Sequence, residues 1–152
     1  MLDFFAELRT NANFEPNVIQ DVTEISQDNR SYLQEAIAYR AEYAEAILQA
    51  EVPLDHQDDN GQTALQYAIS RGMNDLAASI VNKGANLNCL DKYGNDALWT
   101  AVLYPRPSLT LIELLIKKGA DPHRKNSAGR SSADMAVTKN NQAMMVLFGR
   151  QQ

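Results

Sequence analysis

The chain has 152 residues, of which 45% are hydrophobic and 22% charged, and its formal net charge is −5. This length and composition suit one folded domain and exclude a disordered chain. No run approaches the roughly 18 apolar residues of a membrane span, the first residues carry acids where a signal peptide needs positive charge, and Cys89 is the single cysteine. We therefore expect a cytoplasmic protein without a disulfide.

The charge is unevenly distributed along the chain. Residues 1–60 contain thirteen acids and three bases, a net charge of −10, whereas residues 61–152 contain six acids and eleven bases, a net charge of +5. An acidic half argues against general nucleic-acid binding and favours a basic partner protein, whose association it would accelerate. An acidic surface that is merely solvated explains the charge equally well.

Residues 1–30 contain two short amphipathic segments. Their apolar positions are Leu2, Phe5 and Leu8 in the first and Val18, Val22 and Ile25 in the second, which follows Pro16. Apolar residues at this spacing form one face of a helix. We predict that both segments are helices and that residues 1–30 form an N-terminal helical cap.

The next segment, residues 31–57, is a degenerate first copy of a unit that recurs along the rest of the chain. Clear copies follow at residues 58–90, 91–125 and 126–152. Gly61 and Gly94 lie 33 residues apart, and the residues after each glycine match in type. The first two clear copies end in an apolar helix followed by a Gly-Ala pair, and the last copy stops before another such turn.

Each clear copy carries residues that begin and end helices. A side chain that accepts backbone N–H bonds stands where each first helix begins, at Thr63, Asp96 and Ser131. Gly72 and Asn140, which tolerate the left-handed conformation, stand where two of these helices end. A small residue recurs in every first helix, at Ala36, Ala68, Ala101 and Ala136. One helix pair cannot bury its apolar stripe alone, so the copies must stack.

The unit resembles the ankyrin repeat, whose hallmark Asp-x-x-Gly-x-Thr-Pro-Leu-His-x-Ala precedes a second helix and Leu-Leu-x-x-Gly-Ala-x-x-Asn. The resemblance covers about residues 31–148 and implies an all-α solenoid of stacked antiparallel helix pairs joined by β-turns and short loops. Two kinds of departure stand out. Ala64 and Ala97 occupy the position of the family's proline, and Gln66, Trp99 and Asp134 occupy that of its histidine. Those positions brace the first helix, so we expect lower stability in each repeat.

The sequence argues against an enzyme. His56 and His123 are the only histidines and fall in different turns. Asp55, Asp58 and Asp59 surround His56 but lack the spacing of a calcium loop, and no nucleotide-binding or hydrolase motif occurs. Asp58 and Asp91 instead each precede a repeat glycine by three residues, where a carboxylate braces a turn. We expect no catalysis, no cofactor and no metal.

The resemblance implies that a partner protein binds the concave side, which is built from turn tips and the exposed face of the first helices. Matched residue by residue, the site contains Asp59, Asn60, Gln62, Ser70, Arg71, Lys92, Tyr93, Asn95, Leu103, Tyr104, Ser127, Ala128, Arg130, Thr138 and Lys139. Tyr93 and Tyr104 are its strongest candidates because tyrosine, tryptophan and arginine dominate binding hot spots. Trp99 is either a contact or a packing residue, and Arg106 lies in a rigid loop between Pro105 and Pro107, beside Tyr104.

The amino-acid sequence of residues 93–102, 119–123 and 128–131 resembles that of small stand-alone bacterial ankyrin proteins. That resemblance implies a toxin-immunity role, in which the protein inhibits a toxin or effector stoichiometrically. A basic toxin would suit the acidic half, and the protein would be a monomer or part of a hetero-complex. The alternative is an adaptor that binds a peptide or folded partner without inhibiting it.

Overall fold

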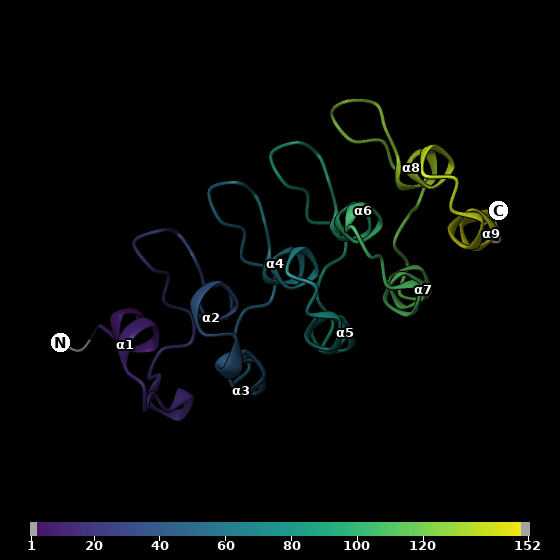
Figure 1. Ribbon diagram of the computed structural model, residues 1–152. Helices are drawn as coiled ribbons and strands as arrows, with labels where there is room; N and C mark the ends of the chain where they lie inside the picture. The colour runs from purple at the N-terminus through teal and green to yellow at the C-terminus, as the bar shows by residue number, and fades with distance from the viewer. Residues whose placement is uncertain (1–2, 150–152) are drawn as a thin grey trace.

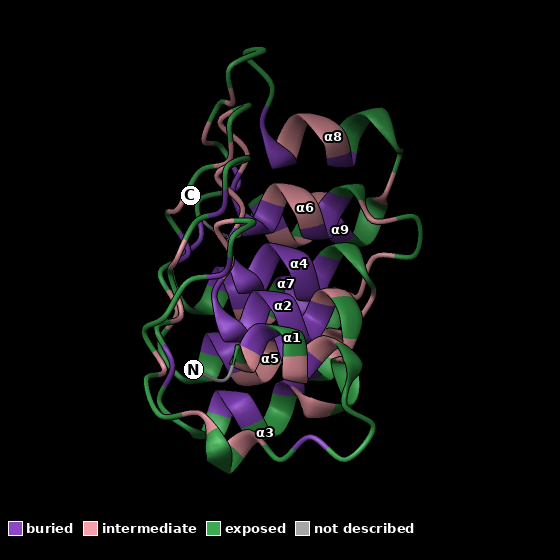
Figure 2. Ribbon diagram, turned by 90° about the vertical axis from the view of Figure 1, so that its left-hand side faces the viewer, coloured by how far each residue is buried: buried purple, intermediate pink, exposed green. Residues whose placement is uncertain are grey.

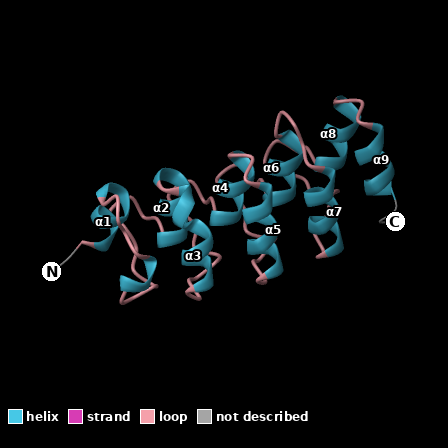
Figure 3. Ribbon diagram, turned by 60° about the horizontal axis from the view of Figure 1, so that its bottom comes forward, coloured by secondary structure: helices cyan, strands magenta, loops and turns pink. Residues whose placement is uncertain are grey.

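A computed structural model describes residues 3–149, whose helices stand in two rows beside a series of projecting turns (Figure 1). The first row consists of α2 (Tyr32–Tyr39), α4 (Ala64–Ser70), α6 (Ala97–Leu103) and α8 (Ser132–Thr138). The second row consists of α3 (Ala44–Gln49), α5 (Asn74–Asn82), α7 (Leu109–Lys117) and α9 (Gln142–Gly149). Figure 3 shows helix pairs without a strand in this part of the chain, which confirms the predicted all-α repeat solenoid.

The first predicted cap segment forms a helix. α1 (Phe4–Thr10) is capped at its N-terminus by Asp3, whose carboxylate accepts the N–H groups of Phe5 and Ala6. The ring of Phe5 stacks on that of Tyr32 in α2, with centroids 4.0 Å apart. Leu8 is fully buried, whereas Leu2 lies outside the described residues. α1 therefore covers the end of the first row.

The prediction of a second cap helix was wrong. After the single 3₁₀ turn η1 (Pro16–Val18) the chain is irregular, and Val18 and Ile25 are 43% and 41% exposed. The carboxylate of Asp21 accepts both the N–H and the hydroxyl of Thr23. Such local side-chain bonds compete with helical backbone bonds, and of the predicted apolar positions only Val22 packs against the core.

Four turns of the same geometry, which we call tip turns, project beside the first row. They comprise residues 26–31, 58–63, 91–96 and 126–131. In each turn the N–H of the first residue donates to the carbonyl of the residue four positions later, and its carbonyl accepts the N–H of the residue three positions later. The carboxylates of Asp58 and Asp91 each also accept two backbone N–H groups, which confirms their bracing role. Because residues 26–31 already have this pattern, we propose that the first repeat begins at Ser26.

Side chains cap the first helices as predicted. Thr63, Asp96 and Ser131 each accept a backbone N–H from the residue three positions later, and Ser31 does so in the degenerate copy. Gly72 and Asn140 have φ angles of 71° and 50°, in the left-handed region that was expected at the helix ends.

Glutamine at the family's histidine position links neighbouring repeats. The Gln66 side-chain oxygen accepts the Thr63 N–H at 3.1 Å, and its Nε2 donates to the Asn95 carbonyl of the next tip turn at 3.0 Å. Gln34 forms the equivalent bonds to the Ser31 N–H and to the Gln62 carbonyl. Both glutamines are essentially fully buried, so each amide fixes a helix start and a repeat interface together.

The tip turns are also joined directly through their backbones. The N–H of Lys92 donates to the Asn60 carbonyl at 2.8 Å, and that of Ser127 donates to the Tyr93 carbonyl at 3.0 Å. This approach requires glycine at position 61, where φ is +75° and an added Cβ would lie 2.9 Å from the Asp91 Cα. Neighbouring tips therefore pack too closely for a side chain at this position.

The hydrophobic core lies between the two rows and along the stack. Figure 2 shows buried residues gathered on the first-row helices. The four repeated alanines are at most 3% exposed, and the apolar pairs of the second row are buried in α5, α7 and α9. Those pairs are Leu76 with Ile80, Leu111 with Leu115, and Met144 with Phe148. Tyr43 is half-buried and ends the short 3₁₀ helix η2 (Ala41–Tyr43) before α3. Among the described helices, none has the length and apolar character needed to cross a bilayer.

The double role of Gln66 predicts the effect of Gln66→Met, which keeps the side-chain length and removes both bonds. The Thr63 N–H would lose its partner inside the stack, and the Asn95 carbonyl would keep only the Asp91 N–H, so the free energy of unfolding should fall by about 1–3 kcal/mol. Urea denaturation followed by circular dichroism measures it. Gln49→Met, at an exposed position of α3, should change stability by less than about 0.5 kcal/mol. Equal losses in both variants would contradict the role assigned to Gln66.

The contact between tip turns predicts a difference between two glycine substitutions. Gly61 and Gly129 have similar φ angles of 75° and 72°, but only Gly61 faces another turn. Alanine at either position should cost about 1–2 kcal/mol of backbone strain. Gly61→Ala should cost at least about 1 kcal/mol more through steric overlap. Thermal unfolding of the two variants tests this, and a Gly129→Ala loss as large as that of Gly61→Ala would refute it.

Candidate partner-binding surface

The side formed by the tip turns and the exposed side of the first-row helices corresponds to the side that the ankyrin resemblance predicts to be concave, and we call it the concave surface. The predicted residues fall on three kinds of element. Asp59, Asn60, Gln62, Lys92, Tyr93, Asn95 and Arg130 lie in tip turns, Trp99, Leu103, Tyr104 and Arg71 lie in or directly after first helices, and Arg106 lies in the α6–α7 loop. Gln62, Asn95, Trp99 and Tyr104 are half-buried, and the others are exposed.

Tyr93 is the most accessible aromatic residue of the predicted site. Its side chain is 59% exposed, and the Lys92 ammonium lies 5.2 Å from its ring centroid. Its backbone N–H donates to Asp91, and its carbonyl accepts the N–H of Ser127. A rigid backbone therefore presents a ring that the fold itself does not bury.

Tyr104 and Trp99 are placed differently. Tyr104 lies against Gly72 so closely that a Cβ at that glycine would collide with the Tyr104 hydroxyl. Part of its ring therefore packs against the preceding repeat. Trp99 occupies in α6 the position that Gln66 occupies in α4, and its ring is half-buried. Here the Asn126 Nδ2 donates to the Asn95 Oδ1 at 2.8 Å, and this bond replaces the missing glutamine link.

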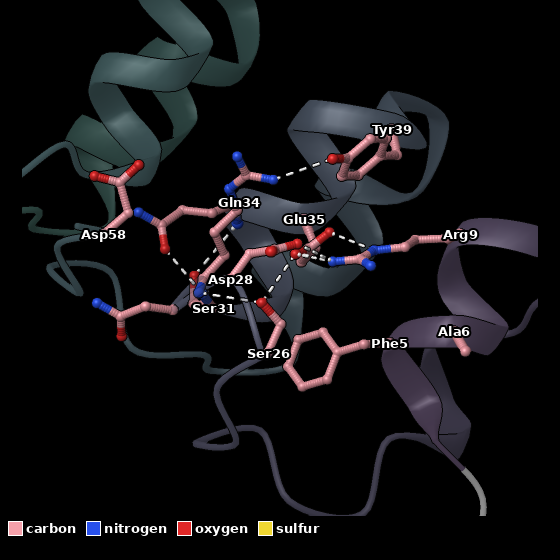
Figure 4. A network of polar contacts seen from close by, with 12 residues as sticks. Phe5, Ala6, Arg9, Ser26, Asp28, Ser31, Gln34, Glu35, Tyr39 and Asp58 are labelled. Carbon is pink, nitrogen blue, oxygen red and sulfur yellow. Dashed lines mark hydrogen bonds and ion pairs between the residues drawn. The ribbon is translucent and has the colours of Figure 1, made fainter. Parts of the chain in front are cut away.

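A polar network at the start of the stack contains residues that the sequence did not identify. Arg9 reaches from α1 to Glu35 of α2, with its Nε and Nη2 at 2.9 and 2.6 Å from the two carboxylate oxygens (Figure 4). Arg9 also pairs with Asp28, and Ser26 donates its hydroxyl to Glu35. The Glu35 side chain is fully buried. This network fixes α1 and the first tip turn against α2.

Arg30 forms the second part of this network. Its Nε donates to the Tyr67 hydroxyl at 3.0 Å and its Nη1 to the Tyr39 hydroxyl at 3.2 Å. Its guanidinium carbon lies 5.9 Å from both ring centroids. The Tyr67 hydroxyl in turn donates to the buried carboxylate of Asp58. Burial, together with this bond, raises the pKa of Tyr67 to about 12, so the hydroxyl stays protonated at neutral pH.

These residues surround an open hollow of about 270 Å³ between α2 and α4, which we call the Arg30–Arg71 hollow. Its lining consists of Arg30, Ala38, Tyr39, Asp58, Asn60, Gln62, Tyr67, Ser70 and Arg71. Arg30 corresponds in its tip turn to Gln62, Asn95 and Arg130, all of which the repeat pattern identified. It was missed because residues 26–30 were assigned to the cap.

Most exposed acids of residues 1–60 lie away from the concave surface. Glu42 and Glu45 belong to η2 and α3, and Glu51 lies in the loop after α3. On the concave surface Asp58 is buried, Asp28 is paired with Arg9, and the exposed Asp59 accepts a bond from the Asn29 amide. The concave surface instead carries cations in or beside three tip turns and at the ends of α4 and α8. They are Arg30, Arg71, Lys92, Arg130 and Lys139.

The two histidines occupy separate turns. The His56 Nε2 lies 2.9 Å from the Asn29 carbonyl oxygen, and His123 is exposed in a turn between other repeats. Within residues 3–149, no group of three or more histidine, cysteine or acidic side chains is arranged to hold a metal ion.

Comparison with known proteins identifies the repeat. A family model for ankyrin repeats in three copies matches residues 33–126. An intracellular phospholipase A2 of Caenorhabditis elegans is 30% identical over 143 residues, which cover 86% of this chain and 13% of that protein. BCL-6 corepressor-like protein 1 of Homo sapiens is 35% identical over 83 residues, which cover 55% of this chain and 4% of that protein.

A bacterial protein is also similar. A putative ankyrin repeat-containing protein of Treponema pallidum is 30% identical over 94 residues, which cover 60% of this chain and 30% of that protein. The chain thus spans less than a third of the length of each of these relatives. The matches agree with the stacked helix pairs and repeated tip turns described above. The chain belongs to the ankyrin repeat family.

Proposed function

We propose that this chain is a non-catalytic cytoplasmic protein that binds one folded partner on its concave surface and inhibits it stoichiometrically. Ankyrin repeats indicate a protein–protein interaction module, and the family is typically non-catalytic. The observation that carries the proposal is the set of exposed side chains on rigid tip turns. Tyr93 and Lys92 illustrate it, because the fold holds their backbones and leaves their side chains to the solvent.

The inhibitory part of the proposal rests on the resemblance of residues 93–102, 119–123 and 128–131 to small bacterial immunity proteins. An immunity protein covers the active site of its toxin, and a stack with exposed residues along several repeats offers a surface wide enough for that purpose. A basic toxin would meet the acids near α3 and the N-terminal loops. The cations of the concave surface would meet acidic groups around the toxin's active site, and the two charged surfaces would orient the complex.

An adaptor is the second candidate function. The acidic surface around η2 and α3 is separate from the basic concave surface, so two partners of opposite charge could bind at once. An adaptor would hold both without changing the activity of either.

The two functions differ in a titration of partner activity. The partner, identified by mass after native pull-down, is titrated with the purified chain while its own activity is measured. Inhibition should be complete at a one-to-one molar ratio. Full activity of a saturated complex would reject the inhibitor and support the adaptor, and the absence of any specific protein partner would reject both.

Tyr93→Ala should weaken this complex without affecting the fold. An exposed aromatic anchor contributes about 1–2 kcal/mol or more to binding when it lies near the centre of an interface. Its removal should change the free energy of unfolding by less than about 0.5 kcal/mol, since the ring is mostly solvated. Isothermal titration calorimetry and urea denaturation measure the two effects. Leu109→Ala, at an exposed apolar position of the second row, should leave the dissociation constant unchanged. Equal effects of both substitutions would exclude Tyr93 as an anchor.

A further inference from the structure

The Arg30–Arg71 hollow contains two cations whose charges no neighbouring carboxylate neutralises through an ion pair. The ion pairs between residues 3–149 involve Arg9, Arg40, Arg124 and Lys125, but neither Arg30 nor Arg71. The hollow is open to solvent on the concave surface and is lined mainly by polar groups. Its chemistry therefore favours an anionic group from outside the chain.

Arg30 is held in place with one end of its guanidinium free. Nε and Nη1 donate to the two tyrosine hydroxyls, and the rings of Tyr39 and Tyr67 flank the group. Its Nη2 makes no hydrogen bond with any described residue. A planar guanidinium fixed in this way needs little further ordering to bind a carboxylate, and charge-assisted hydrogen bonds of this kind are among the strongest in proteins.

Two further donors face the same space. Arg71 follows the last residue of α4 and is exposed. The Oδ1 of Asn60 accepts the Lys92 ammonium at 2.9 Å, which leaves its amide nitrogen as a donor. The hollow thus offers donors from a tip turn and from the end of a first helix.

The charge of the lining favours a group with a single negative charge. Asp58 is the one carboxylate among the lining residues of the hollow. Its oxygens already accept hydrogen bonds from the N–H groups of Asn60 and Gln62 and from the Tyr67 hydroxyl. Two arginines and this aspartate give a net charge of +1. One carboxylate neutralises that charge, whereas a doubly charged phosphate would leave an uncompensated negative charge in the hollow and would also lose more hydration on entering it.

We propose that the Arg30–Arg71 hollow receives the carboxylate of an aspartate or glutamate side chain on the partner protein. This proposal rests on the proposed partner-binding function and assigns an acidic contact to the concave surface. The acids near α3 stay available for a second, basic part of the same partner.

The hollow can be tested on the intact chain with a small probe. N-acetyl-glutamate N-methylamide carries the side-chain carboxylate alone, and its glutamine analogue is the neutral match. At constant ionic strength, the carboxylate probe should shift the Nε–H resonances of Arg30 and Arg71 in a saturable manner, and the neutral probe should not. Equal shifts with both probes, tighter binding of inorganic phosphate, or no saturable shift would each overturn the proposal.

Two matched variants separate a specific site from general charge. Arg71→Gln should weaken the carboxylate probe at least about tenfold, the loss expected for one charge-assisted contact. Lys83→Gln removes the same charge from the residue that follows α5 in the same repeat, and it should leave the affinity within about twofold. Similar losses in both variants would show that only net charge matters and would reject the hollow as a site.

The same variants distinguish the failure of this proposal from the failure of the proposed function. If the partner binds wild-type and Arg71→Gln chains equally well, the hollow is not a contact and the partner-binding function stands. If Arg71→Gln weakens the partner at least about tenfold and Lys83→Gln does not, the proposal is supported. If no partner exists, the probe titration still reports whether the hollow binds a carboxylate.

Discussion

The architecture depends on buried hydrogen bonds that join the first helices α2 and α4 to the tip turn of the next repeat. A single helix pair is too thin to bury its apolar side, so the interface between repeats must stabilise both neighbours. Gln34 and Gln66 meet this need with one amide each, which bonds its own helix start and a carbonyl of the following repeat. Helix formation and stacking are thereby coupled, because the same amide group caps its own helix through its oxygen and holds the following repeat through its nitrogen.

The side chains that join neighbouring helices and repeats differ from one end of the stack to the other. At the start, the buried Glu35 is held by Arg9 and Ser26, so α1 is fixed by ions rather than by apolar contacts alone. A buried carboxylate is costly unless it is fully paired, and a satisfied network favours one arrangement over others. Toward the other end, where Trp99 replaces glutamine, the Asn126 amide and the Lys139 ammonium bond to Asn95 and Val102 of the preceding repeat.

The repeat architecture could be predicted because glycine spacing and helix-capping residues are local signals. Gly61 and Gly94 mark tip turns, and Thr63 and Ser131 mark helix starts, whatever the distant chain does. The first tip turn was missed because Asn29 replaces the glycine there, with a φ of 53°. The Arg30–Arg71 hollow was missed for a different reason, since Arg30, Tyr39 and Tyr67 meet only after α2 and α4 have stacked. Tyr104 was predicted as a contact residue, but its packing on Gly72 depends on the same stacking.

The backbone bonds between tip turns have a consequence for how the surface can diversify. Lys92 and Ser127 bond to the preceding tip turn through their main-chain N–H groups, and Lys92 adds a bond from its ammonium to Asn60. Every residue except proline provides a main-chain N–H, so the backbone contact between neighbouring tip turns does not depend on the side chains at these two positions. Selection can therefore exchange those side chains one at a time and alter what is recognised, while the backbone contact between neighbouring tip turns is kept.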